Sequence, residues 1–173
     1  MVMKPEPIFK AFDDVKLHFK KELPRIIYPS PDGKKFNQEE AKKLKENDSL
    51  VFICGHYKGV DQRVRDELVT DEYSIGDYVI TGGELSSLVI ADSVIRLIPG
   101  ALNNIESAQT DSFESNLLDC AYYTRPEVYR DLKVPEVLLS GHHEKIKEWK
   151  LKLKKEKTKK YRPDLWLKYN NEN

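Results

Sequence analysis

The chain contains little cysteine. Its 173 residues include two, Cys54 and Cys120, which lie far apart in the sequence. This spacing argues against a metal site built from paired cysteines and against a fold held together by disulfides. Free thiols are typical of proteins in a reducing compartment, so the sequence predicts a cytoplasmic location.

Long apolar runs are absent as well. No stretch approaches the roughly 20 apolar residues that span a bilayer, and the first residues do not form the apolar core of a signal peptide. We therefore expect a soluble protein. A chain of 173 residues is long enough for one domain, or for one domain with a small appendage.

The chain also lacks net charge, because 29 Lys and Arg balance 29 Asp and Glu. Residues 145–162, however, hold ten Lys and Arg against two Glu. A basic amphipathic helix can present a solvated face, lie on a membrane, bind a partner or cover an acidic ligand. Aromatic residues near this segment favour nucleic acid, because Lys and Arg contact phosphates while rings stack on bases. They are Trp149, Tyr161, Trp166 and Tyr169.

Several catalytic and phosphate-binding motifs are missing. Without Gly-x-Gly-x-x-Gly or a Walker-type Gly-Lys-Ser/Thr after a strand, a dinucleotide or a nucleoside triphosphate is a poor candidate ligand. There is no nucleophile elbow and no serine–lysine arrangement. His142 and His143 are adjacent, with no third ligand at a helical or hairpin spacing. We interpret them as a helix cap or an RNA-contacting turn rather than as a metal site.

Glycine occurs instead where strand-like runs end. Segments 54–61 and 74–84 each place glycine between an apolar, strand-like run and a helix-like pattern. At such junctions in an α/β protein, bare backbone N–H groups approach a ligand. The turn at 29–33 is a third loop of this kind. Tight turns alone also explain these glycines, but the repeated junction suggests one shared site.

Hydrophobic patterning predicts an α/β fold. The predicted order is a helix over 5–23, a strand over 25–28 ended by the turn at 29–33, and a helix from a capping box at Asn37 to about 47. A strand over 50–54, a helix over 61–68, a strand over 71–80 and an apolar helix from 82–83 to Pro99-Gly100 follow. We expect this last helix to be buried, in the core or in a subunit interface. A polar linker or active-site loop at 101–114 precedes the basic helix from Glu144.

Two charged residues are conspicuous. Arg96 interrupts the apolar run at 94–98, so its guanidinium must snorkel, pair with a carboxylate or meet an anionic ligand. Asp111 lies in the polar loop, where a cap or a solvated side chain is the ordinary role. Spacing alone assigns no chemistry to either residue.

Six segments in matching order resemble the bacterial tRNA (guanine-N1)-methyltransferases, which belong to the trefoil-knotted (SPOUT) class. The resemblance runs from about residue 1 to 165. It implies a parallel α/β sheet in which 28–31, 54–59 and 74–83 form a deep trefoil knot, a topology that general rules would have excluded. The six segments are 54–64, 73–85, 96–100, 110–113, 123–127 and 140–143.

The same resemblance divides the chain into three parts. It implies a knotted cofactor-binding domain at 1–100, an interdomain linker with a catalytic loop at 101–115, and a basic helical tRNA-binding domain at 116–173. The first of these is expected to be incomplete at its N-terminus, because residues 1–5 match a point well inside the family sequence. The missing strand, helix and strand would complete the sheet and help to build the dimer.

The resemblance also implies an activity and a set of site residues. A methyl group passes from S-adenosylmethionine to N1 of the guanosine 3′ of the anticodon in tRNA, with a role for a divalent cation such as Mg left open. Asp111 is the general base and Arg96 the electrostatic stabiliser. The family works as a homodimer whose active sites combine loops of both subunits. The cofactor positions map onto Tyr28, Ser30, Pro31, Gly55, Tyr57, Ser74, Ile75, Gly76, Asp77, Tyr78, Val79, Ile80, Gly82 and Gly83.

The chain departs from the family at His56, Lys58 and Gln62, where Arg, Glu and Glu are common, so family roles are not transferred to these positions. Together with the expected missing front, which would leave a sheet edge exposed, this leaves an alternative open. The alternative is a non-catalytic RNA-binding remnant or fragment of the enzyme. If the chain stands alone, we expect weaker stability and weak or no catalysis. Methylation of another RNA base is a third reading, against which segments 96–100 and 110–113 speak.

Overall fold

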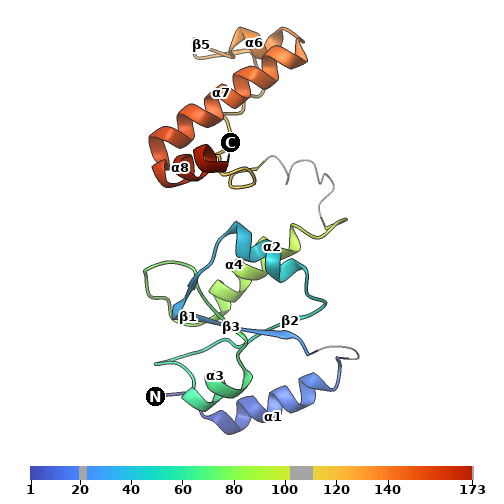
Figure 1. Cartoon of the computed structure of the whole chain (residues 1–173), viewed down its shortest axis with the longest axis vertical. Coiled ribbons are helices and arrows are strands. Elements are labelled where there is room, and N and C mark those ends of the chain that lie inside the picture. The colour runs from blue at the N-terminus through green and yellow to red at the C-terminus, as the bar shows by residue number, and fades with distance from the viewer. Residues whose placement is uncertain (20–22, 102–110, 173) are drawn as a thin grey trace. The chain divides into compact units, whose positions relative to one another are not determined.

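The computed structural model describes residues 1–19, 23–101 and 111–172 of the chain. It forms two compact units, Met1–Ile105 and Glu106–Asn173. The first unit carries a parallel sheet with helices on both faces, and the second is mainly helical (Figure 1). An α/β fold with a helical C-terminal region was expected from the sequence, and it is confirmed.

A three-stranded parallel sheet forms the centre of the first unit. Strand β1 (Arg25–Lys35) lies between β2 (Leu50–Phe52) and β3 (Asp71–Ser74). Consecutive parallel strands need crossover connections. Helix α2 (Gln38–Lys45) lies in the connection from β1 to β2, and α3 (Gln62–Leu68) in the connection from β2 to β3. The parallel sheet was predicted, whereas the trefoil knot stays a prediction.

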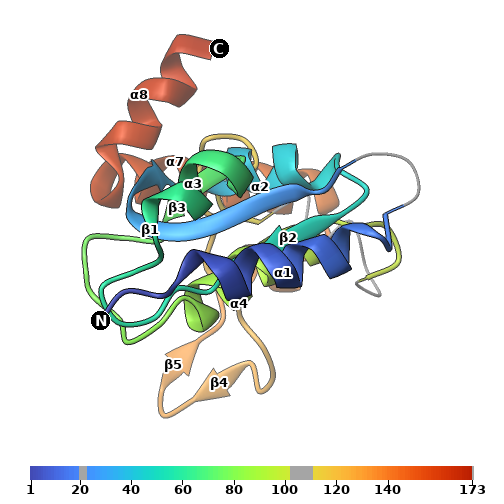
Figure 2. The ribbon, with the colours of Figure 1, turned by 90° about the horizontal axis from the view of Figure 1, so that it is seen from below.

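Successive side chains of β1 point to opposite faces of the sheet, as the pleat of a strand requires. Ile27 packs against α2 and α4 (Glu84–Ile95), while Tyr28 packs against α3 and α1 (Pro5–Lys16). In Figure 1, α2 and α4 cover one face and α1 and α3 the other; Figure 2 looks onto the second face. The buried residues of the first cluster are Ile27, Ala41, Leu44, Tyr73, Ile90 and Val94.

Strand β1 is longer than predicted, because the turn residues at 29–33 do not end it. The strand continues to Lys35, and its pairing with β3 shifts register between Pro29 and Lys34. The irregularity absorbs the prolines, which cannot donate to a ladder. Gly33 makes the continuation sterically feasible: a β-carbon there would lie 2.5 Å from the backbone nitrogen of Tyr73. The predicted end of the strand at 28 is therefore wrong.

Other elements are shorter than predicted. Helix α1 ends at Lys16 rather than at 23, and β3 ends at Ser74 rather than at 80. Gly76, at φ 148°, takes the chain out of the extended conformation, so 75–80 forms a loop. Strand β2 ends at Phe52, two residues early. Helix α2 does begin at the predicted cap, where the Asn37 side chain accepts from the Glu40 N–H.

Helix α4 is covered on one side. Ser86, Ser87, Ile90 and Val94 are buried, whereas a set of large apolar residues is exposed within this chain. The helix is therefore not fully buried within the chain by itself, and its burial in a subunit interface stays a prediction. An exposed apolar face of this kind marks an interaction surface. The exposed residues are Leu85, Leu88, Val89, Ile95 and, just beyond the helix, Ile98.

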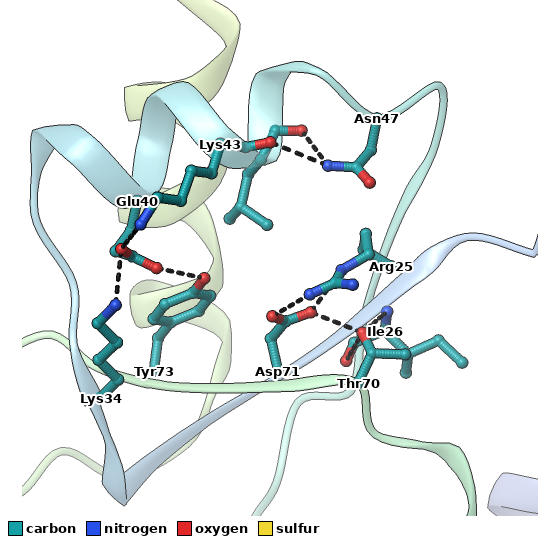
Figure 3. Close-up of polar contacts among 10 residues, drawn as sticks. Arg25, Ile26, Lys34, Glu40, Lys43, Asn47, Thr70, Asp71 and Tyr73 are labelled. Atoms are coloured by element: carbon teal, nitrogen blue, oxygen red, sulfur yellow. Dashed lines mark hydrogen bonds and ion pairs between the residues drawn. The ribbon is translucent and has the colours of Figure 1, made fainter.

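Glu40 is a buried carboxylate at the centre of a polar cluster on the α2 face of the sheet (Figure 3). It accepts hydrogen bonds from Lys34 at 2.8 Å, from Lys43 at 2.9 Å and from the Tyr73 hydroxyl at 3.1 Å. The hydrogen bonds from the two lysines lower the pKa of Glu40 to about 2. Burial, with the hydrogen bond to Glu40, raises the pKa of Tyr73 to about 12.

Glu40→Gln should therefore destabilise the fold by about 2 kcal/mol at neutral pH. Because the pKa of Glu40 is depressed on folding, its contribution is present above about pH 4.5 and is lost as the pH falls towards 2. Urea denaturation at pH 7 and pH 3 measures the difference, which should shrink at the lower pH. Glu39→Gln is the matched control, because Glu39 is exposed and its pair with Lys43 contributes little. An equal loss for both variants would contradict the assignment.

The second unit is built on two helices, α7 (His143–Tyr161) and α8 (Pro163–Glu172), which pack together. Thr158 of α7 is fully buried, and its hydroxyl accepts from the Leu118 N–H at 2.8 Å. Strands β4 (Val128–Tyr129) and β5 (Leu132–Lys133) form a hairpin, and the short helix α6 (Glu136–Leu139) precedes α7. Helix α7 confirms the helix predicted from Glu144. Within the described residues, no helix is both long enough and apolar enough to cross a membrane.

Candidate functional site

The predicted cofactor residues surround one cavity of about 200 Å³ in the first unit. It lies where the chain leaves the three parallel strands, so loops from distant parts of the sequence form its wall. All of the predicted cofactor residues line it except Asp77. The lining also includes residues that the sequence did not single out as cofactor positions, namely Pro29, His56, Lys58, Gly59, Tyr73, Thr81 and Ser86.

Three loops form the cavity wall and are numbered in chain order: 28–31, 54–59 and 74–83. The second loop packs against a tyrosine of the central strand. Tyr28 is 7% exposed, and a β-carbon on Gly55 would lie 2.8 Å from its hydroxyl oxygen. A β-carbon on Gly59 would lie 3.2 Å from the same oxygen, and Gly59 has φ 113°. Glycine is thus required at two places where backbone approaches the ring.

The third loop is joined to the second by backbone. The Gly83 N–H donates to the Gly55 carbonyl at 2.9 Å, and the Gly83 carbonyl accepts from Ser86 and Ser87 in the first turn of α4. A β-carbon on Gly83 would lie 2.9 Å from both Cys54 Cα and Gly55 N. Because these are backbone atoms, the clash cannot be relieved by rotating a side chain.

Gly83→Ala should therefore move the second loop against the third. We expect a stability loss of about 1–3 kcal/mol and, for the S-adenosylmethionine site that the family resemblance predicts here, at least about tenfold weaker binding of S-adenosylhomocysteine. Urea denaturation and calorimetric titration measure the two effects. Gly100→Ala is the control: nothing lies within 4 Å of the added carbon, but φ is 84°, so it costs stability without affecting the cavity. Wild-type affinity in Gly83→Ala would contradict the expectation.

Exposed apolar and strained residues lie around the cavity. Tyr57, Tyr78 and Val79 are 69%, 59% and 93% exposed. Tyr57 also has φ 61°, which costs a non-glycine residue about 1–2 kcal/mol. Residues held in such conformations cluster where a ligand or partner is bound. These features indicate that a ligand or a partner, in addition to the side chains of the first unit, completes the site.

His56 connects the second and third loops through its side chain. Its Nε2 is hydrogen bonded to Glu84 Oε1, and its backbone pairs with Gly82. The pKa of Glu84 is lowered. The larger cause is the hydrogen bond from its own backbone N–H in the first turn of α4, and the smaller cause is the hydrogen bond with His56. The sequence marked His56 only as a departure from the family pattern. Its proximity to Glu84 depends on the folding of two loops and had no local signal.

Arg96 and Asp111, the predicted catalytic residues, belong to different units. Arg96 is the half-buried C-cap residue of α4, where its N–H donates to the Asp92 carbonyl at 3.1 Å. Asp111 is half-buried at the start of a turn in the second unit. The predicted linker lies partly outside the described residues, since 102–110 are not among them.

The turn that carries Asp111 is held by its own unit. The Ser112 hydroxyl accepts from the Asp119 N–H at 2.9 Å, and the Arg162 guanidinium lies 5.7 Å from the centre of the Phe113 ring. Asp119 in turn pairs with Lys154 of α7 at 2.8 Å. The position of Asp111 is therefore tied to the basic helix.

Aromatic and basic side chains lie side by side along this helix. Trp149 packs against Tyr123, and Lys150 lies over the ring of Tyr122. Trp166 and Tyr169 of α8 are stacked. His142 is the residue before α7, as predicted for a helix cap, although its side chain makes no cap hydrogen bond. In the part of the chain that the structure covers, no cluster of three or more His, Cys, Asp or Glu could hold a metal ion.

Comparisons with known proteins place the chain beside one group of enzymes. The family model described as tRNA (Guanine-1)-methyltransferase TrmD matches residues 1–168. A tRNA (guanine-N(1)-)-methyltransferase of Chlorobium luteolum is 51% identical over 165 residues, which are 95% of this chain and 70% of the relative. Enzymes of the same name from Shouchella clausii and Listeria monocytogenes are 54% and 51% identical, over 95% and 98% of this chain and 67% and 69% of their own.

Proposed function

The chain belongs to the tRNA (guanine-1)-methyltransferase family, and from this we propose that it methylates N1 of the guanosine 3′ of the anticodon in tRNA, using S-adenosylmethionine. The observation that carries the proposal is the single cavity lined by the family's cofactor positions from three separate loops. Glycines 55 and 83 leave no room for side chains there. Backbone groups and the Tyr28 ring would hold the cofactor, which supplies an electrophilic methyl group when bound.

Guanine N1 carries a proton and is a poor nucleophile, so the reaction needs a base. We assign this role to Asp111, whose carboxylate would accept the N1 proton as the new bond forms. As the proton leaves, negative charge develops on guanine O6. Arg96 would stabilise that charge, and its fixed positive charge needs no proton transfer of its own. Both roles are supported by the match of segments 96–100 and 110–113 to the family pattern.

The second unit would bind the anticodon branch of the tRNA. Lysines of α7 supply charge for phosphates, and the neighbouring rings offer stacking surfaces to unpaired bases. Because the turn carrying Asp111 is anchored to the same helices, RNA bound there would bring its target base and the base catalyst together. A tRNA substrate implies a cytoplasmic location.

The enzyme would act as a homodimer. The exposed apolar face of α4 supports this, since burying it against a second copy removes those side chains from water. In the proposed dimer, each active site combines the cavity of one subunit with Asp111 of the other. That arrangement fits the presence of the cavity and Asp111 in separate units.

The test is transfer of labelled methyl groups to unmodified tRNA with guanosine 3′ of the anticodon. Label at guanine N1, and none in a tRNA with adenosine at that position, is the expected result. Binding of tRNA without transfer would instead identify a non-catalytic RNA-binding remnant. Repeating the assay with a chelator in place of Mg²⁺ measures whether a divalent ion takes part.

A further inference from the structure

Arg65 of α3 joins two strands of the sheet through one guanidinium. Its Nε donates to Glu72 Oε1 at 2.8 Å, and its Nη2 donates to Glu72 Oε2 at 2.7 Å and to Asp32 Oδ2 at 2.8 Å. The side chain is 22% exposed. Glu72 belongs to β3 and Asp32 to β1, so the group spans the irregular part of their pairing.

The same guanidinium also packs on the tyrosine that forms the cavity wall. Arg65 Cζ lies 5.5 Å from the centre of the Tyr28 ring. The opposite end of this ring, its hydroxyl, fits against Gly55 and Gly59 of the second loop. A shift of the ring would therefore be transmitted directly to that loop, because there is no spare space between them.

The two carboxylate partners are each next to cavity residues. Glu72 directly precedes Tyr73 and Ser74, which line the cavity, and the Asp32 N–H donates to the Ser30 hydroxyl at 3.0 Å. Arg65 itself lies outside the cavity lining. Through Tyr28, Asp32 and Glu72, it reaches all three loops that form the wall.

We propose that Arg65 is a positioning residue of the cofactor site, which fixes the Tyr28 ring and the spacing of the three loops. This inference rests on the proposed function, because it takes the cavity to be the S-adenosylmethionine site. A planar fork is needed for the role, since the group must pair with Glu72 in two places, reach Asp32 and stack on a ring. A lysine offers a point charge and cannot do all of this.

The chain supplies a matched control in Arg25. This residue makes the same forked pair with Asp71, with Nε 2.8 Å from Oδ2, and likewise joins β1 to β3. Neither Arg25 nor Asp71 lines the cavity. Loss of the fork at Arg25 tests the effect of a weakened sheet without disturbing the Tyr28 ring.

The experiment is calorimetric titration of the full chain with S-adenosylhomocysteine, for the wild type, Arg65→Met, Arg65→Lys and Arg25→Lys. We expect about tenfold weaker binding in Arg65→Met, a smaller but measurable loss in Arg65→Lys, and wild-type affinity in Arg25→Lys. The number of sites per total chain should stay constant. In methyl transfer, the loss should appear in KM for the cofactor, with kcat at saturation nearly unchanged.

A fall in the number of sites with unchanged affinity would overturn the inference, because it would show that Arg65 serves only to keep the chain folded. Equal losses in Arg65→Lys and Arg25→Lys would overturn it as well. If Arg65→Met does not fold, Arg65→Lys and Asp32→Asn decide by the same readout. A wild-type chain that binds no S-adenosylhomocysteine would overturn the proposed function and this inference together, whereas tight wild-type binding shared by every variant would overturn the inference alone.

Discussion

Asp111→Asn should lower the rate of methyl transfer by about 10²–10⁴-fold. The amide keeps the size of the side chain but cannot accept the guanine N1 proton. Single-turnover transfer to tRNA measures the rate, and titration with S-adenosylhomocysteine should give wild-type affinity, because Asp111 and the cavity belong to different units. The residual rate should rise with pH, since the variant depends on guanine that has already lost its proton.

Asp14→Asn makes the same chemical change on the exposed side of α1 and should leave the rate unchanged. An unaltered rate in Asp111→Asn would show that Asp111 is not the general base.

The proposed dimer allows a second experiment, which tests whether each active site combines residues of both subunits. At a cofactor concentration well below saturation of Gly83→Ala, co-expression of Asp111→Asn with Gly83→Ala should restore about a quarter of wild-type activity, because half of randomly paired dimers are mixed and each has one intact site. If each subunit's own Asp111 served its own cavity, the mixture would stay at the low activity of the two single variants.

Arg96→Gln should slow transfer by about 10²–10³-fold. The substitution removes the positive charge proposed to stabilise guanine O6, so the loss should appear in kcat rather than in the affinity for the cofactor. Arg96→Lys keeps the charge without the planar fork, so its rate of transfer should lie between those of the wild type and Arg96→Gln. Transfer at saturating tRNA and cofactor measures all three.

Thermal denaturation shows whether the lower kcat of Arg96→Gln comes from the reaction or from a loss of folded protein. Arg96 is the C-cap of α4, where a cation interacts favourably with the helix dipole, so its loss should cost about 0.5 kcal/mol. That amount leaves the folded population almost complete. Wild-type kcat in a folded Arg96→Gln would show that the guanidinium serves the end of the helix and not the reaction.

The sequence predicted elements with strong local signals. The capping box at Asn37 marked the start of α2, and apolar, strand-like runs marked the parallel strands. It failed at Pro29 and Gly33, because turn residues usually end a strand, whereas here the close passage of β3 keeps the segment extended. It did not decide whether the apolar helix α4 packs in a core or in a subunit interface, since hydrophobicity alone does not tell a core from a surface that binds another molecule.

The sequence likewise predicted some residues of the candidate site and missed others. The glycine junctions pointed to the three loops before any fold was known, and Asp77 is the one predicted cofactor residue outside the lining. Nothing local linked Arg65 to Tyr28 or His56 to Glu84, because each pair joins residues far apart in the chain. Such partners become visible only when the strands are paired. The roles of Arg96 and Asp111 stay predictions, which the two experiments above test.

The order of the strands has a consequence for how the protein is made. The middle strand, β1, leaves the ribosome first, while its neighbours follow at residues 50–52 and 71–74. Ile27 must therefore wait for Phe52 and then for Asp71 before both of its edges are paired. Pairing between such distant residues is slow, and during that time an apolar strand is open to other nascent chains. The cavity is completed only after residue 86 has emerged, so its loops can close only late in synthesis.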